Sequence, residues 1–149
     1  DLMKRKPRNP AEPILTRGLF LYTLGISAVI FIGTLGLYAL SLRGGASVEG
    51  ARTTVFAALV IFELYNAYNS RSLRDSFFKM DPRTNKKLAA GLAASLAGLL
   101  VAIYLPFMQR LFDTIPLNAS SWIAILVAAS AVVVVAEIFK RWELPERRA

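Results

Sequence analysis

The sequence contains no cysteine and no histidine, and acidic residues are scarce, with 10 Asp and Glu against 18 Lys and Arg in 149 residues. Without cysteine, the chain has no disulfide scaffold, thiol nucleophile or iron–sulfur site. Without cysteine and histidine together, it has no ordinary zinc site and no histidine-based triad or proton shuttle. Composition therefore excludes these site chemistries from the chain.

Apolar residues dominate what is present. They make up 55% of the chain and give a mean hydropathy of +0.47, which is more apolar than a soluble domain of this size usually is. A net charge of +8 is also a feature of nucleic-acid-binding proteins. Here the basic residues lie between long apolar blocks, so we expect a lipid bilayer as the partner and no nucleic acid.

Four apolar blocks account for most of the length. They cover residues 18–42, 53–70, 88–109 and 117–139. At about 1.5 Å per residue, each block is long enough to cross a hydrocarbon core of about 30 Å as a helix. Because backbone polar groups must be satisfied inside lipid, such blocks predict helices. We therefore predict an all-α membrane protein of one domain, with a polar leader at residues 1–17 and four transmembrane helices.

The basic residues alternate between the segments that flank the blocks. Fifteen of the 18 lie in the leader, in the loop between the second and third blocks, and in the tail. The other two loops hold only Arg43, Arg52 and Arg110. Cytoplasmic loops are enriched in Lys and Arg, so this distribution predicts that both termini and the middle loop are cytoplasmic.

Two blocks carry small residues at helical spacing, which let helices approach closely in lipid. In the first block this stripe consists of Gly25, Ala28 and Gly36, with Gly33 beside them. In the third block the stripe is longer and consists of Gly91, Ala94, Ser95, Gly98 and Ala102. Two interpretations stay open, namely packing within this chain and docking of helices outside it.

Glu63 is the most informative residue, because it lies about midway along the second block. An ionised carboxylate at that depth costs at least about 2.5–3.5 kcal/mol. Asn66 and Ser70 share its helical face and Asn69 does not, so Glu63 and Asn66 form a short strip of oxygen ligands. Calcium prefers about six to eight oxygens. Either Glu63 is a protonatable or structural group, or further ligands come from helices outside the chain.

The other acidic residue inside a block is Glu137, near the end of the fourth. It lies three residues before Lys140, and this spacing predicts an ion pair on one helix face rather than a second cation ligand.

The chain begins with Asp1 and enters a basic leader directly. We expect it to be a fragment, or a domain cut from a longer polypeptide.

Three motifs resemble one family of proteins. The leader Asp1-Leu-Met-Lys-Arg-Lys-Pro-Arg-Asn-Pro resembles the D-I/L-M-x-R-x-P-R-x-P run that follows the sixth transmembrane helix of type II P-type cation ATPases. Residues 62–72, Phe-Glu-Leu-Tyr-Asn-Ala-Tyr-Asn-Ser-Arg-Ser, resemble the eighth helix of sarcoplasmic-reticulum-type calcium pumps, with its E-x-x-N-A-x-N-S run. Residues 136–140, Ala-Glu-Ile-Phe-Lys, are similar to the D-E-I-L-K end of the tenth helix. The resemblance covers the whole chain in order.

The resemblance implies that residues 1–149 are the seventh to tenth helices of such a pump, its C-terminal support domain. The glutamate that matches Glu63 ligates one of two calcium ions in calcium pumps and is linked to proton countertransport, while the match to Asn66 is a weaker, supporting ligand. The implied partners are the remaining transmembrane helices and the cytoplasmic domains. ATP and magnesium would bind only in those missing domains, and the chain alone cannot hydrolyse ATP.

The first outer loop, of about ten residues, departs from the vertebrate pumps, whose loop is much longer. We expect a multi-pass protein of a prokaryotic plasma membrane. Two other functions stay open on the residues alone. One is a small stand-alone transporter with Glu63 as its proton-coupling group, and the other is a membrane scaffold that transports nothing.

Overall fold

The computed structural model describes residues 16–71, 76–79, 81 and 84–142. These residues form α-helices and one 3-10 turn, with no β-strand among them, and the order along the chain is α1 (Arg17–Arg43), α2 (Val48–Asn69), η2 (Phe77–Lys79), α3 (Lys86–Tyr104), α4 (Pro106–Phe112) and α5 (Ala119–Trp142). The all-helical prediction is confirmed for this part of the chain. The leader expected at residues 1–17 lies outside the described residues, except for Thr16 and Arg17.

Three of the helices begin at a polar residue whose side chain caps a free backbone N–H group of the first turn. The hydroxyl or amide oxygen accepts the bond, and the pairs are Thr16 Oγ1 with Leu19 N at 3.3 Å, Ser47 Oγ with Gly50 N at 3.1 Å and Asn85 Oδ1 with Leu88 N at 3.0 Å. The starts of α1, α2 and α3 are therefore set locally.

The block expected at 88–109 is divided into two helices. α3 ends at Tyr104, Leu105 is extended (φ −85°, ψ 120°), and α4 begins at Pro106. Proline disfavours helical geometry in the residue before it and suits the first turn of the helix that follows. α4 then ends at Phe112, and the next residue, Asp113, adopts the left-handed conformation (φ 53°). The apolar run continues past the point where the helix stops.

Three helices, α1, α3 and α5, are long and apolar enough to cross a membrane. α2 is not among them, although the sequence predicted four spans. Its 22 residues carry Arg52, Glu63 and the amides of Asn66 and Asn69, which lower its hydropathy. The expectation of four spans is thus supported for three helices, and a fourth span along α2 stays a prediction.

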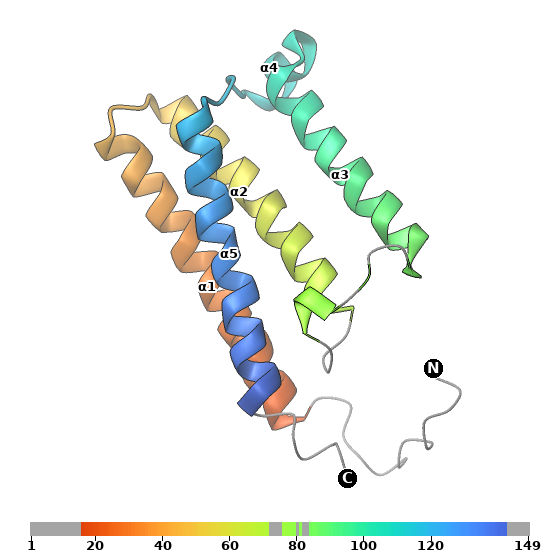
Figure 1. Cartoon of the computed structure of the whole chain (residues 1–149). Coiled ribbons are helices and arrows are strands. Elements are labelled where there is room, and N and C mark those ends of the chain that lie inside the picture. The colour runs from red at the N-terminus through yellow and green to blue at the C-terminus, as the bar shows by residue number, and fades with distance from the viewer. Residues whose placement is uncertain (1–15, 72–75, 80, 82–83, 143–149) are drawn as a thin grey trace.

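α2 lies between the other long helices. α1, α2 and α5 pack on one another, while α3 lies beside α2 and carries the short α4 at its end (Figure 1). The core forms where α1, α2 and α5 meet. Its residues include Ile26 and Leu37 of α1, Ala58 and Phe62 of α2, and Ile125, Ala129 and Val132 of α5. The least apolar long helix is therefore the one that this chain shields best.

The small residues of α1 serve packing within the chain. A Cβ atom built on Gly25 would lie 2.9 Å from the ring of Phe139 on α5, and one on Gly33 would lie 2.6 Å from the ring of Phe62 on α2. Gly36 has no such neighbour within 4 Å. For two of these glycines, packing inside the chain is thus the correct interpretation, because each lets a large ring approach the α1 backbone.

We expect Gly33→Ala to destabilise the bundle. The Phe62 side chain is fully buried and its ring would lie 2.6 Å from the added Cβ, and overpacking of this kind costs about 1–3 kcal/mol. Gly36→Ala is the matched control on the same helix, and there the better helix propensity of alanine predicts no loss. Thermal unfolding of the detergent-solubilised full-length protein compares them. Equal midpoints for both variants would contradict the packing assigned to Gly33.

A buried polar network joins all three core helices at the end where α1 begins and α5 ends. Asn69 donates a hydrogen bond from Nδ2 to the Tyr22 hydroxyl at 3.2 Å and accepts one at Oδ1 from Lys140 Nζ at 2.7 Å. Lys140 also pairs with Glu137 at 3.9 Å, and Glu137 Oε1 accepts a hydrogen bond from Phe77 N at 2.7 Å. The predicted Glu137–Lys140 pair is confirmed, and it belongs to a larger network that connects α1, α2 and α5 with the 3-10 turn η2.

We expect Asn69→Leu to destabilise the fold more than Asn69→Leu combined with Lys140→Met. The single change removes the nearest acceptor of a buried ammonium group, whereas the double change removes the charge as well. A double-mutant cycle on thermal stability is predicted to give a coupling of about 1–3 kcal/mol between the two positions. Additive effects would mean that the 2.7 Å contact contributes nothing to stability.

Candidate cation site on helix α2

Glu63 lies on the side of α2 that the rest of the described chain leaves open. Its side chain is exposed, and so are those of Ala67 and Ser70, one and two turns further along. Asn66 is half-buried on the same side. In contrast Phe62, the residue before Glu63, is fully buried in the core. α2 thus presents one buried face and one open face that carries the carboxylate.

The polar residues of this open face form one contact among themselves. Ser70 Oγ donates a hydrogen bond to Asn66 Oδ1 at 3.4 Å. Within the described part of the chain, no hydrogen bond or ion pair reaches the Glu63 carboxylate. Glu63, Asn66 and Ser70 therefore share one face, as their spacing indicates, and the Glu63 carboxylate is left exposed on it.

The described residues do not complete a metal site. No group of three or more acidic side chains lies close enough together in residues 16–71, 76–79, 81 and 84–142 to hold a metal ion. Glu137 is committed to Lys140 and to the backbone of Phe77. Since calcium prefers about six to eight oxygens, Glu63 and Asn66 supply only part of such a set. Chemically, this face offers carboxylate and amide oxygens, which are the kind of ligand that hard cations prefer.

The rotation of α2 is set by Asn69, a role that the sequence did not indicate. At about 100° per residue, Asn69 lies about 120° around the helix from Glu63. Its amide joins α1 and α5, and this contact turns Glu63 away from them. A buried asparagine inside an apolar block is a signal for such a role, because an amide in the core needs partners. Which partners it finds depends on the fold.

The small-residue face of α3 is open as well. Nothing lies within 4 Å of a Cβ built on Gly91 or on Gly98, and the side chains of Ala94 and Ser95 are exposed. α3 is also the long helix with the fewest buried residues. Ala102, the last residue of this stripe, is buried, whereas the four small residues before it are left uncovered by the described part of the chain.

Comparison with known proteins places these features in a family. The family described as "Cation transporting ATPase, C-terminus" matches residues 1–142. Human "Calcium-transporting ATPase type 2C member 1" is 34% identical over 143 residues, which cover 96% of this chain and 16% of that protein. "Calcium-transporting ATPase 1" of Saccharomyces cerevisiae is 32% identical over 143 residues, covering 95% of this chain and 15% of that protein.

A bacterial protein is similar to this chain to a comparable degree. "Probable cation-transporting ATPase F" of Mycobacterium tuberculosis is 31% identical over 134 residues, which cover 90% of this chain and 15% of that protein. The chain thus spans only 15–16% of the length of these relatives. With three helices apolar enough to cross a membrane and a family match over residues 1–142, the chain is an integral membrane domain that belongs to the C-terminal family of cation-transporting ATPases.

Proposed function

We propose that this chain is the membrane support domain of an ATP-driven calcium pump, corresponding to its seventh to tenth transmembrane helices. Glu63 offers its carboxylate to the transported calcium ion in one state of the pump and takes up a proton in the other. Asn66 is a weaker, auxiliary ligand. ATP and magnesium bind in domains outside these residues, and the partners are those domains and the other transmembrane helices.

The observation that carries this proposal is the exposed carboxylate of Glu63 on an otherwise well-buried helix. An ionised carboxylate that faces lipid is strongly unfavourable, so Glu63 requires a protein or aqueous environment on its open side. The described residues place no partner there. Helices of a larger pump would cover this face and add the oxygen ligands that calcium still needs. The exposed small residues of α3 offer a second surface for such helices.

The proposal includes the topology. α2 crosses the membrane as the fourth span, because its 22 residues reach about 33 Å, Asn69 is buried within this chain, and helices of the larger pump would cover Glu63. Both termini and the loop after α2 are cytoplasmic, as the concentration of Lys and Arg in those segments indicates. We place the protein in a prokaryotic plasma membrane, in line with its short first outer loop and its bacterial relative.

We expect Glu63→Gln in the full-length pump to weaken calcium binding about tenfold or more. The neutral amide keeps the shape of the side chain but removes one negative oxygen from the cation, and even an indirect partner of a metal ligand contributes about 10–100-fold. Asn66→Ala is predicted to have a smaller effect. Calcium-dependent ATP hydrolysis and equilibrium calcium binding provide the two measurements.

Glu49→Gln is the matched control, since Glu49 lies in the first turn of the same helix. This variant is expected to bind calcium as the unchanged protein does. If Glu63→Gln leaves both the affinity and the number of bound calcium ions unchanged, the ligand role is wrong. The membership of the family would stand, because it rests on the sequence match alone.

Single cysteines test the fourth span, because this chain has no cysteine of its own. In a full-length pump cleared of other cysteines, Ala46→Cys lies just before α2 and Lys79→Cys lies beyond its other end. With intact cells and a membrane-impermeant maleimide, we expect labelling at position 46 and none at position 79 until the cells are permeabilised. Labelling of both positions in intact cells would show that α2 does not cross.

A further inference from the structure

A cavity of about 360 Å³ opens between α2, α3 and α5. Every residue that lines it is aliphatic or aromatic: Ile61, Leu64 and Tyr65 of α2, Leu96 and Leu100 of α3, and Trp122 and Leu126 of α5. The cavity exists because α3 packs against α2 and not closely against α5 (Figure 1). The cavity is open to the surface, and its apolar lining favours an apolar occupant.

The cavity lies on the opposite side of α2 from the candidate cation site. At about 100° per residue, Ile61 is about 160° around the helix from Glu63. The helices that would complete a cation site at Glu63 therefore do not need to fill this cavity. Four of its lining residues belong to α3 and α5, which are apolar enough to cross a membrane, and there the apolar molecules at hand are lipid acyl chains.

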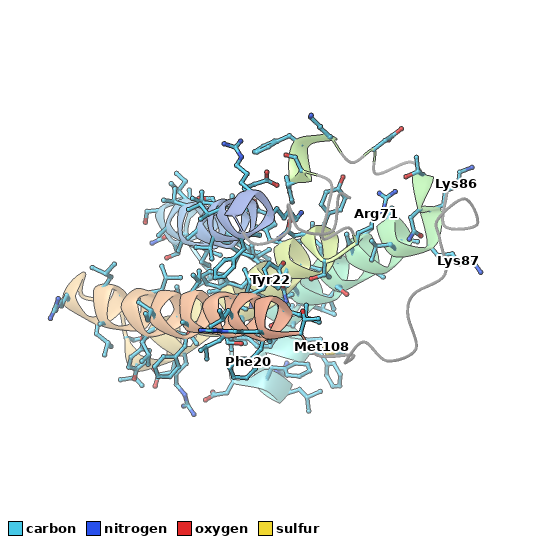
Figure 2. All side chains as sticks on the ribbon, turned by 90° about the horizontal axis from the view of Figure 1, so that it is seen from below. Phe20, Tyr22, Arg71, Lys86, Lys87 and Met108 are labelled. Carbon is cyan, nitrogen blue, oxygen red and sulfur yellow. The ribbon has the colours of Figure 1, made fainter. Side chains whose placement is uncertain are left out.

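Three basic side chains lie at one end of the same pair of helices. Arg71 follows the last residue of α2 by two positions, and Lys86 and Lys87 are the first two residues of α3. Arg71 Nη1 donates to the carbonyl of Asp81 at 2.8 Å and its Nη2 donates to Thr84 Oγ1. The second bond holds the guanidinium at Thr84, which is two positions before Lys86 in the sequence. Figure 2 shows the three cations around the end at which α3 begins.

The position of the two lysines is itself unfavourable. Both occupy the first turn of α3, at the positive end of the helix dipole, and that turn contains no acidic residue. Both side chains are exposed, and neither has an ion pair among the described residues. α2, by comparison, has Glu49 in its first turn. A helix N-terminus with two cations and a nearby guanidinium is suited to a phosphate group.

We propose that the cavity and the three basic side chains together form a groove that binds one anionic phospholipid. Its phosphate contacts Arg71, Lys86 and Lys87, and one acyl chain extends along α2 and α3 into the cavity. Lys86 lies about 80° around α3 from Leu96 and about 15 Å from it along the helix, and Arg71 and Tyr65 are separated by about 9 Å. Half of a hydrocarbon core is about 15 Å thick, so a chain anchored at the basic residues reaches the cavity. Under the proposed topology the lipid belongs to the cytoplasmic leaflet, which carries the anionic lipids.

Native mass spectrometry of the delipidated full-length protein tests this site, with phosphatidylglycerol and phosphatidylcholine titrated separately. Each basic residue near an anionic lipid contributes about fivefold, so Lys86→Gln with Lys87→Gln is expected to weaken phosphatidylglycerol binding about thirtyfold. Phosphatidylcholine binding should not change. Leu100→Trp fills the cavity and is expected to weaken binding of both lipids. The matched controls are Arg110→Gln, on α4 beyond the other end of α3, and Leu35→Trp, on the exposed side of α1, and both should bind as the unchanged protein does.

Three results would overturn the proposal. One is that Leu100→Trp binds phosphatidylglycerol as tightly as Leu35→Trp does, since the chain would then not enter the cavity. Another is that glycerophosphoglycerol, which has the same headgroup and no chains, competes with the lipid at equal concentration, as a plain phosphate site would allow. The third is that the delipidated protein takes up no phosphatidylglycerol, as it would if protein covers the groove.

Discussion

One amide, that of Asn69, joins the three core helices: it donates a hydrogen bond to Tyr22 on α1 and accepts one from the Lys140 ammonium on α5. In a membrane, a buried polar group has no water available for hydrogen bonding, so its partners have to come from protein. This requirement sets the rotation of α2. The opposite consequence appears six residues earlier, where Glu63 is left without a partner among the described residues.

Close packing makes this rotation rigid. The ring of Phe62 lies against the backbone of α1 at Gly33, and the ring of Phe139 lies against it at Gly25. These contacts hold α1, α2 and α5 together and leave α3 at the side of the bundle (Figure 1). α2 consequently has two uncovered sides, a polar one with Glu63 and an apolar one at the cavity beside α3. A support domain with a cation ligand on one side and a lipid on the other would use both.

The sequence predicted much of the fold because hydropathy and charge act locally. Long uncharged runs in lipid have to be helical, and α1, α3 and α5 follow the expected blocks closely at most of their ends. Hydropathy did not show that the third block breaks at Leu105, although Pro106 was visible in the sequence. An apolar residue is equally acceptable in a helix and in the turn beside it, so only the backbone constraint of proline marked this end.

The candidate site was predictable in part for a similar reason. Helical periodicity alone places Glu63, Asn66 and Ser70 on one face and Asn69 on another, and the motif around them identified the family to which residues 1–142 belong. Periodicity does not say which face is turned inward. A helix with polar residues on two sides has two possible orientations, and the difference lies in contacts between residues far apart in the chain.

The sequence by itself determined the helical class, the basic segments that flank the helices, and the family. Each of these follows from composition, local pattern or motif. The tertiary structure alone decided that α2, the least apolar of the long helices, is the best covered, that Lys140 is buried against Asn69, and that a cavity separates α3 from α5. These features depend on how side chains up to 71 residues apart meet, and no local pattern encodes such a meeting.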